Sequence, residues 1–191
     1  MIYIFRHGMT ESNLIGNLLS ESDEELLPKG VEYFKNISKK LSDLNIDNIY
    51  TSPYKRAYQS GSIIANKIGK KLVVVDKLIE RKLGDFDGVS KTDVRYKNRI
   101  DDLKNINYIP PNGEAPKHAV KRFKSMVDDV LDNKGNSVII SHGGIIYLYM
   151  RYVLNQYENT CFLDNGECHI IEKKDNSEIV VTNSKYDFLR N

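Results

Sequence analysis

The sequence of 191 residues has only two cysteines, no long apolar run and nearly equal numbers of charges of each sign. No apolar stretch approaches the ~20 residues of a membrane-spanning helix, which argues against a membrane protein. The opening run, Met1–Phe5, is short and ends at the charged Arg6, so we expect a first strand rather than a signal peptide. Without an export signal, a cytoplasmic location and free thiols at Cys161 and Cys168 are expected.

The near balance of charge excludes a strong overall attraction to anionic partners. Lys and Arg number 28, Asp and Glu number 26, and the net charge is +2. We therefore expect neither nucleic acid nor a membrane surface as a partner, and any anion site must come from local placement of arginines. Cys161, Cys168 and His169 could together bind a metal ion, but their spacing matches no strong zinc template, so simple burial is the favoured interpretation.

Strand and helix patterns alternate along the chain. Strands are predicted over residues 1–5, 48–51, 71–75, 138–140, 168–172 and 178–182, and helices over 28–44, 53–67, 90–104, 116–133 and 144–155. In the second helix, Ser52 is expected as N-cap, Pro53 in the first turn and Gly69 at the end. This order predicts one α/β domain over residues 1–191, a three-layer α/β/α fold with a mostly parallel sheet. The irregular segment 83–115 is expected to cover a crevice at the sheet edge.

Two histidines follow predicted buried strands and precede glycine. His7 comes after Met1–Phe5, and His142 comes after Val138–Ile140. Ligands of open α/β sheets bind outside the carboxyl ends of the strands, and glycine lets the backbone approach a ligand closely. We therefore expect both imidazoles in one crevice, and Arg6 beside His7 indicates an anionic ligand.

Three further side chains are suited to a phosphate. Arg56 lies in the first turns of a predicted helix, whose exposed amides add partial positive charge. The arginine fork matches two phosphate oxygens and stays charged. His142 can donate to a phosphate, and Glu80 follows a strand, which places it at the same edge. Together these residues predict phosphoryl transfer, a reaction that depends on electrostatic stabilisation of spread oxygen charge.

The chain resembles the histidine phosphatase superfamily, also called the phosphoglycerate mutase-like family. The segments that carry the resemblance are, in order, Arg6-His7-Gly8-Met9-Thr10-Glu11-Ser12-Asn13, Ser52-Pro53-Tyr54-Lys55-Arg56-Ala57, Leu78-Ile79-Glu80, Gly84-Asp85-Phe86-Asp87-Gly88, Pro111-Asn112-Gly113-Glu114 and Ser141-His142-Gly143-Gly144. Asp23, Leu26 and Gly30 also fit the family spacing. The resemblance covers residues 2 to about 150 and implies the phosphoglycerate mutase-like fold.

The resemblance also implies a mechanism. His7 would be the nucleophile and become a phosphohistidine, and Glu80 would protonate the leaving oxygen and then activate water. Three further catalytic residues would bind the phosphoryl oxygens, namely Arg6, Arg56 and His142. The implied substrate-binding residues are Arg6, Thr10, Asn13, Arg56, His142 and Gly143. No metal or cofactor is implied, because arginines and a histidine supply the charge.

Some positions depart from the family pattern. Leu19-Ser20 stands where many members have Gln-Gly, so the resemblance does not predict the shape of one pocket wall. Leu27 replaces a usual Thr or Ser, Phe86 a frequent Trp, and Ala115 a frequent Ser.

We favour a metal-independent phosphatase for a small phosphorylated metabolite, because the segment after Glu80 is shorter than in most mutases of the family. In this respect the chain resembles the short phosphatase branch of the family, which includes α-ribazole phosphatases and broad-specificity phosphatases. The alternatives are phosphoglycerate mutase-type phosphoryl transfer and a non-catalytic module that binds a phosphorylated ligand. The sequence contains no convincing spacing of metal ligands for a metal-dependent hydrolase. A homodimer is possible, since family members are often dimers.

Overall fold

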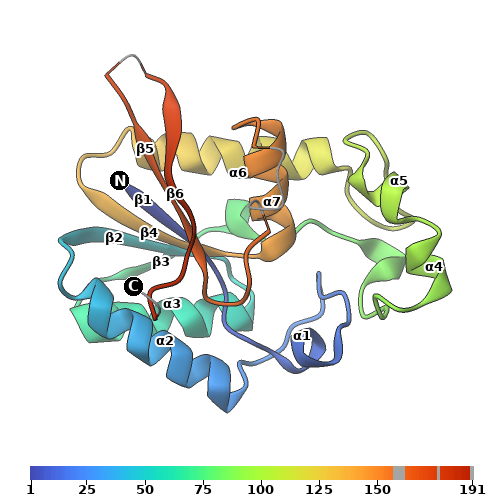
Figure 1. Ribbon diagram of the computed structural model, residues 1–191, viewed down its shortest axis with the longest axis horizontal. Helices are drawn as coiled ribbons and strands as arrows, with labels where there is room; N and C mark the ends of the chain where they lie inside the picture. The colour runs from blue at the N-terminus through green and yellow to red at the C-terminus, as the bar shows by residue number, and fades with distance from the viewer. Residues whose placement is uncertain (157–161, 176, 190–191) are drawn as a thin grey trace.

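The computed structural model describes residues 1–156, 162–175 and 177–189, and a mixed sheet forms its centre (Figure 1). The six strands lie in the order β3-β2-β4-β1-β5-β6. Their bounds are β1 Ile2–Arg6, β2 Ile46–Thr51, β3 Leu72–Val74, β4 Asn136–Ser141, β5 Cys168–Lys173 and β6 Ile179–Tyr186. The first four strands are mutually parallel, whereas β5 runs antiparallel to β1 and to β6. The sheet is therefore mostly parallel, as predicted.

Helices cover both faces of the sheet (Figure 1). α2 (Pro28–Leu41) and α3 (Lys55–Ile68) pack on one face, and α6 (Pro116–Leu131) and α7 (Gly143–Tyr152) pack on the other. In β1, Ile4 belongs to the core on the α6–α7 side, and its neighbour Phe5 to the core on the α2–α3 side. This alternation follows from the two-residue period of a strand and confirms the three-layer α/β/α architecture.

The segment after β3 is irregular and carries only short helices. Two 3₁₀ turns, Asp76–Leu78 and Gly84–Phe86, precede α4 (Val94–Lys97) and α5 (Ile100–Lys104). The single helix predicted over residues 90–104 is wrong, because Arg99 leaves the helical region with φ −121° and ψ 4°. α4 and α5 lie beyond the edge of the sheet, on the right of Figure 1.

The predicted start of α3 is also wrong. The helix begins at Lys55, and its N-cap, Tyr54, makes no side-chain cap bond. The Lys55 N–H instead donates to Asp23 Oδ1 at 2.7 Å, so a carboxylate from a distant loop stabilises the helix N-terminus. Gly69 ends the helix with φ +68°, as expected of a left-handed C-cap.

Three remaining expectations concern metal, thiols and membranes. Cys161 lies outside the described residues, whereas Cys168 is a buried, free cysteine in β5. Within the described ranges, no group of three His, Cys, Asp or Glu side chains could hold a metal ion. In the same part of the chain, no helix combines the length and the hydropathy required to cross a membrane.

Candidate functional site

Two adjacent parallel strands bring the predicted histidines together. β1 and β4 pair with Arg6 opposite Ser141, and His7 and His142 follow these partners directly. The ring centroids of His7 and His142 lie 5.2 Å apart in an edge-to-face arrangement. Both imidazoles therefore lie at the carboxyl ends of these strands.

The His7 ring is oriented by its own loop. Its Nδ1 lies 2.7 Å from the Gly8 carbonyl oxygen. Because a carbonyl oxygen only accepts, Nδ1 carries the hydrogen and Nε2 keeps its lone pair. Burial, and then the charges of Arg56 and Arg6, lower the pKa of His7 well below its usual value. The ring is therefore neutral and has one nitrogen available as a nucleophile.

Asn165 holds the His7 loop in place and was missed by sequence reasoning. Its Nδ2 contacts the His7 carbonyl oxygen at 3.0 Å, the Gly8 carbonyl oxygen at 3.2 Å and Asn13 Oδ1 at 2.9 Å. The Asn-Gly pair before β5 is a turn signal, and β5 pairs with β1. The signal marks a turn but says nothing about which loop the amide would reach.

Arg56 is completely buried, and its guanidinium is fixed by three hydrogen bonds. Nη1 donates to the Ser22 carbonyl oxygen and Nη2 to the Ser20 carbonyl oxygen, both at 2.8 Å. Nε donates to His142 Nδ1 at 3.2 Å. The Tyr54 ring packs 4.9 Å from the guanidinium carbon. A rigid cation thus lies beside both histidines.

His142 differs from the expectation that it is free to donate to a phosphate. Its Nδ1 accepts from Arg56, so Nε2 carries the hydrogen and donates to Ser52 Oγ at 2.8 Å. Burial, and then the charges of Arg56 and His7, lower the pKa of His142 well below its usual value. Both ring nitrogens are engaged within the protein, and the ring orients Arg56.

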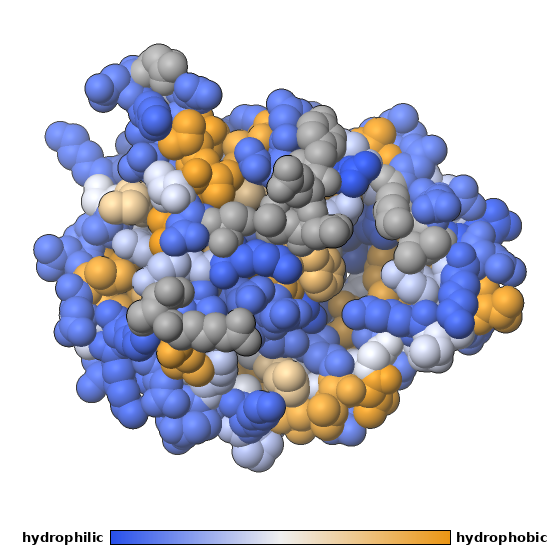
Figure 2. Space-filling view, in the orientation of Figure 1, coloured by the Kyte–Doolittle hydropathy of each residue, from blue (hydrophilic) through white to orange (hydrophobic). Residues whose placement is uncertain are grey.

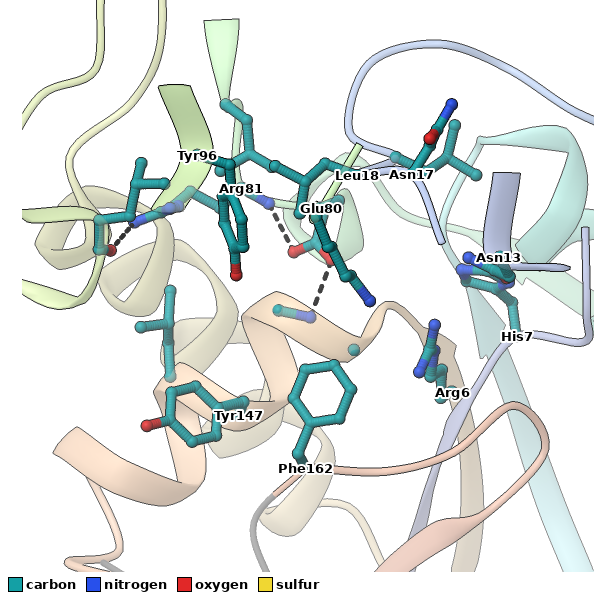
Figure 3. Close-up of a pocket in the computed structure, with 17 residues that line it drawn as sticks. Arg6, His7, Asn13, Asn17, Leu18, Glu80, Arg81, Tyr96, Tyr147 and Phe162 are labelled. Carbon is teal, nitrogen blue, oxygen red and sulfur yellow. Dashed lines mark hydrogen bonds between the residues drawn. The ribbon is translucent and has the colours of Figure 1, made fainter. Parts of the chain in front are cut away.

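The Glu80 carboxylate lies against the N-terminus of α7 (Gly143–Tyr152). Oε1 accepts from the Arg81 N–H at 2.8 Å, and Oε2 accepts from the Gly144 N–H at 2.9 Å (Figure 3). Oε1 also accepts from the Ile145 N–H at 2.7 Å. A Cβ on Gly144 would lie only 2.8 Å from Oε1, so this close approach requires glycine. The carboxylate is held by amide donors at a helix N-terminus.

Arg6 presents an unused donor. Its Nη1 donates to the Leu163 carbonyl oxygen at 2.8 Å, and its guanidinium carbon lies 5.4 Å from the centre of the Phe162 ring. Its Nε is buried and has no hydrogen-bond partner among the described residues. A Cβ on Gly143 would lie 3.1 Å from this Nε. A buried, unpaired donor on a cation is suited to an incoming anion.

A cavity of about 350 Å³ opens in front of these groups (Figure 3). Of the predicted site residues, its lining includes Arg6, His7, Asn13, Glu80 and Gly143. Arg56 and His142 are fully buried and do not line it.

Thr10 is not brought to the cavity. It is completely buried, and its Oγ1 accepts from the Asn13 N–H at 3.5 Å, which caps α1 (Glu11–Ile15). The Asn13 side chain closes the capping box by accepting from the Thr10 N–H at 3.4 Å.

The unusual Leu19-Ser20 pair shapes the wall of the cavity. Ser20 Oγ donates to the Arg81 carbonyl oxygen at 2.8 Å and accepts from the Leu83 N–H at 2.9 Å. The Ser20 N–H donates to Asp87 Oδ1 at 2.6 Å. Ser20 thus connects its loop to the segment after Glu80, and Leu19 contributes an apolar side chain to the cavity lining.

Comparison with known proteins finds one family match and several relatives. The model of the histidine phosphatase superfamily (branch 1) matches residues 2–184. A putative phosphoserine phosphatase 2 of Hydrogenobacter thermophilus is 28% identical over 151 residues, which cover 76% of this chain and 74% of that protein. Phosphoglycerate mutase-like protein 4 of Arabidopsis thaliana is 32% identical over 155 residues, which cover 76% of this chain and 67% of that protein.

Solved structures share the fold. A mycobacterial glucosyl-3-phosphoglycerate phosphatase superimposes with a TM-score of 0.83 at 19% identity, covering 96% of this chain and 98% of the other. A putative alpha-ribazole-5'-P phosphatase of Escherichia coli superimposes with a TM-score of 0.81 at 18% identity, covering 97% and 96%. At these identities the likeness concerns the fold alone, which is that of the phosphoglycerate mutase-like proteins.

Proposed function

Because the chain belongs to branch 1 of the histidine phosphatase superfamily, we propose that it hydrolyses a small-molecule phosphomonoester through a phosphohistidine on His7. The state of His7 carries this proposal. Its Nδ1–H is directed at the Gly8 carbonyl oxygen, so the Nε2 lone pair is available near Arg6 and the buried Arg56. A neutral, oriented imidazole with cations around it is what nucleophilic attack on a phosphate requires.

The reaction proceeds in two displacements. His7 Nε2 attacks phosphorus, the phosphorus–oxygen ester bond breaks, and a protonated Glu80 gives its proton to the leaving oxygen. Water then attacks the phosphohistidine, gives a proton to Glu80, and the nitrogen–phosphorus bond breaks to release inorganic phosphate. Glu80 Oε2 accepts only one N–H among the described residues, so this oxygen has room for the proton.

The cations stabilise charge on the phosphoryl oxygens. Arg6 contributes its unpaired Nε as a donor, and the buried Arg56 contributes the positive charge of a guanidinium that is fixed before the substrate arrives. Such preorganised donors cost no reorganisation during the reaction, and removal of one lowers the rate by about 10²–10³-fold. Because arginines supply the positive charge, we expect catalysis to persist when a chelator removes metal ions.

The test is turnover by the purified chain of a chromogenic aryl phosphate and a panel of phosphomonoesters in a chelator. We expect hydrolysis and an acid-labile, base-stable phosphoenzyme, both absent in His7→Ala. The matched control is His118→Ala, because His118 is exposed on α6. Isomerisation of 3-phosphoglycerate that outpaces hydrolysis would make the chain a mutase. Phosphate binding without any turnover would make it a binding module.

A further inference from the structure

We propose that the alcohol part of the substrate is apolar, an alkyl or aryl group, and that it binds in the part of the cavity away from His7. This inference rests on the proposed phosphatase function. The cavity has two chemically different ends. Arg6, His7, Asn13 and Glu80 form the end where the phosphoryl group reacts. Most of the remaining lining is apolar.

Leucines from three separate segments form one part of this apolar lining. Leu18 and Leu19 come from the loop after α1, Leu83 follows Glu80, and Leu103 lies on α5. Leu18 is held by two backbone hydrogen bonds, from its N–H to Val89 and from Gly88 to its carbonyl oxygen. The leucine wall is therefore built on segments that are hydrogen-bonded to one another.

Aromatic side chains form another part. The Tyr147 and Phe162 rings lie 6.2 Å apart and 57° tilted, and in Figure 3 they stand across the cavity from Leu18 and Tyr96. Phe162 is 41% exposed although it contacts the Arg6 guanidinium. A large apolar side chain left open beside the reactive end offers a contact surface to an apolar ligand group.

Two further cations, Arg81 and Lys91, also line the cavity. Arg81 Nη1 donates to the Leu103 carbonyl oxygen at 2.8 Å, so its guanidinium anchors α5. Burial, and then the charge of Arg6, lower the pKa of Lys91, so its ammonium is less favoured than that of an exposed lysine.

The test uses a series of n-alkyl phosphates from ethyl to hexyl, together with glycerol phosphate and 3-phosphoglycerate. The alcohols of the alkyl series differ little in acidity, so changes in kcat/KM report burial of the chain rather than chemistry. We expect kcat/KM to rise by about two- to fourfold per methylene until the cavity is filled. Both polar phosphates should react more slowly than butyl phosphate.

Substitutions in the leucine wall test where the alkyl chain of the substrate binds. Leu19→Gln should flatten the rise along the series, and Leu83→Thr serves the same purpose if Leu19→Gln fails to fold. The control is Leu14→Gln, because Leu14 is 62% exposed on α1 and does not line the cavity. This control variant should leave the rise of kcat/KM with alkyl chain length unchanged.

The outcomes separate this inference from the function it rests on. A flat series, a preference for 3-phosphoglycerate, or an unchanged slope in the folded wall variant overturns the apolar alcohol and leaves the phosphatase standing. Failure to hydrolyse any phosphomonoester overturns the phosphatase itself.

Discussion

At the scale of single residues, the two histidines that the sequence presents alike have different surroundings. His7 uses one nitrogen for the Gly8 carbonyl oxygen and keeps the other available. His142 uses both, one for Arg56 and one for Ser52. The difference arises because His142 is flanked by a buried guanidinium and a hydroxyl, whereas the outer side of His7 borders the cavity.

Gly144→Ala is expected to lower kcat/KM by about 10²-fold with little effect on stability. The added Cβ would lie 2.8 and 2.9 Å from the two Glu80 oxygens and displace the proposed general acid. Steady-state kinetics and urea unfolding measure the two effects. Gly69→Ala should show the reverse, a loss of about 1 kcal/mol with unchanged kinetics, because Gly69 has φ +68° and open space around it. Full activity in Gly144→Ala would contradict the role of Glu80.

Stability is expected to fall as the pH drops below about 6.5. Burial and the nearby arginines lower the pKa values of His7 and His142 in the folded protein. Below pH 6.5 the unfolded chain therefore binds protons that the folded chain does not. The free energy of unfolding then decreases by about 1.4 kcal/mol per pH unit for each histidine, until the pH reaches the folded pKa.

Urea unfolding between pH 7.5 and 5.5 in phosphate-free buffer measures this slope. His142→Asn should reduce it, and His118→Ala should not, because His118 is exposed. An equal slope in wild type and His142→Asn would show that the buried ring is not kept neutral.

At the scale of elements, α6 positions the segment that carries Glu80. Arg122 Nη1 donates to the Ile79 carbonyl oxygen at 2.7 Å, and Nη2 donates to the Glu80 carbonyl oxygen at 2.9 Å. The same guanidinium pairs with Glu114 at 3.1 Å, and both side chains are largely buried. One arginine thus fixes the backbone carbonyl groups before and after the Glu80 Cα, through paired donors that lysine cannot reproduce.

Arg122→Lys is expected to slow substrates with poor leaving groups selectively. A displaced Glu80 delivers its proton poorly, so kcat/KM for phenyl phosphate should fall by about 10²-fold. Dinitrophenyl phosphate, whose leaving group needs no proton, should change only a few-fold. Lys124→Ala is the matched control, because Lys124 pairs with Asp128 on the exposed side of the same helix. Equal losses on both substrates would indicate general destabilisation instead.

At the scale of the whole molecule, one sheet joins two hydrophobic cores. Ile37 on α2 and Ile146 on α7 are completely buried on opposite faces. Because every strand except β3 contributes side chains to both cores, we propose that residues 1–191 unfold as one domain.

Ile37→Ala and Ile146→Ala should each lower the free energy of unfolding by about 2–5 kcal/mol in a single transition. The chain has no tryptophan and 12 tyrosines, so tyrosine fluorescence and far-UV circular dichroism are suitable probes. Coincident curves are expected. Separate transitions for the two variants would contradict a single cooperative unit.

The sequence by itself determined the layered fold, the order of the strands along the chain and the meeting of His7 with His142. Hydrophobic period and glycine after a strand are local signals, and parallel strands place their carboxyl ends at one edge. The same signals indicated a phosphate ligand through Arg6 and Arg56. They failed over residues 90–104, where no continuous apolar face supports one helix.

Only the tertiary structure decided which atoms at that edge are available. The bond from Arg56 to His142 spans 86 positions, that from Lys55 to Asp23 spans 32, and that from Asn165 to the His7 carbonyl oxygen spans 158. Such contacts depend on loops that the sheet topology brings together. A sequence pattern extends over a few residues, whereas a hydrogen bond depends on distance and direction in space, so the donors and acceptors of this site were set by packing.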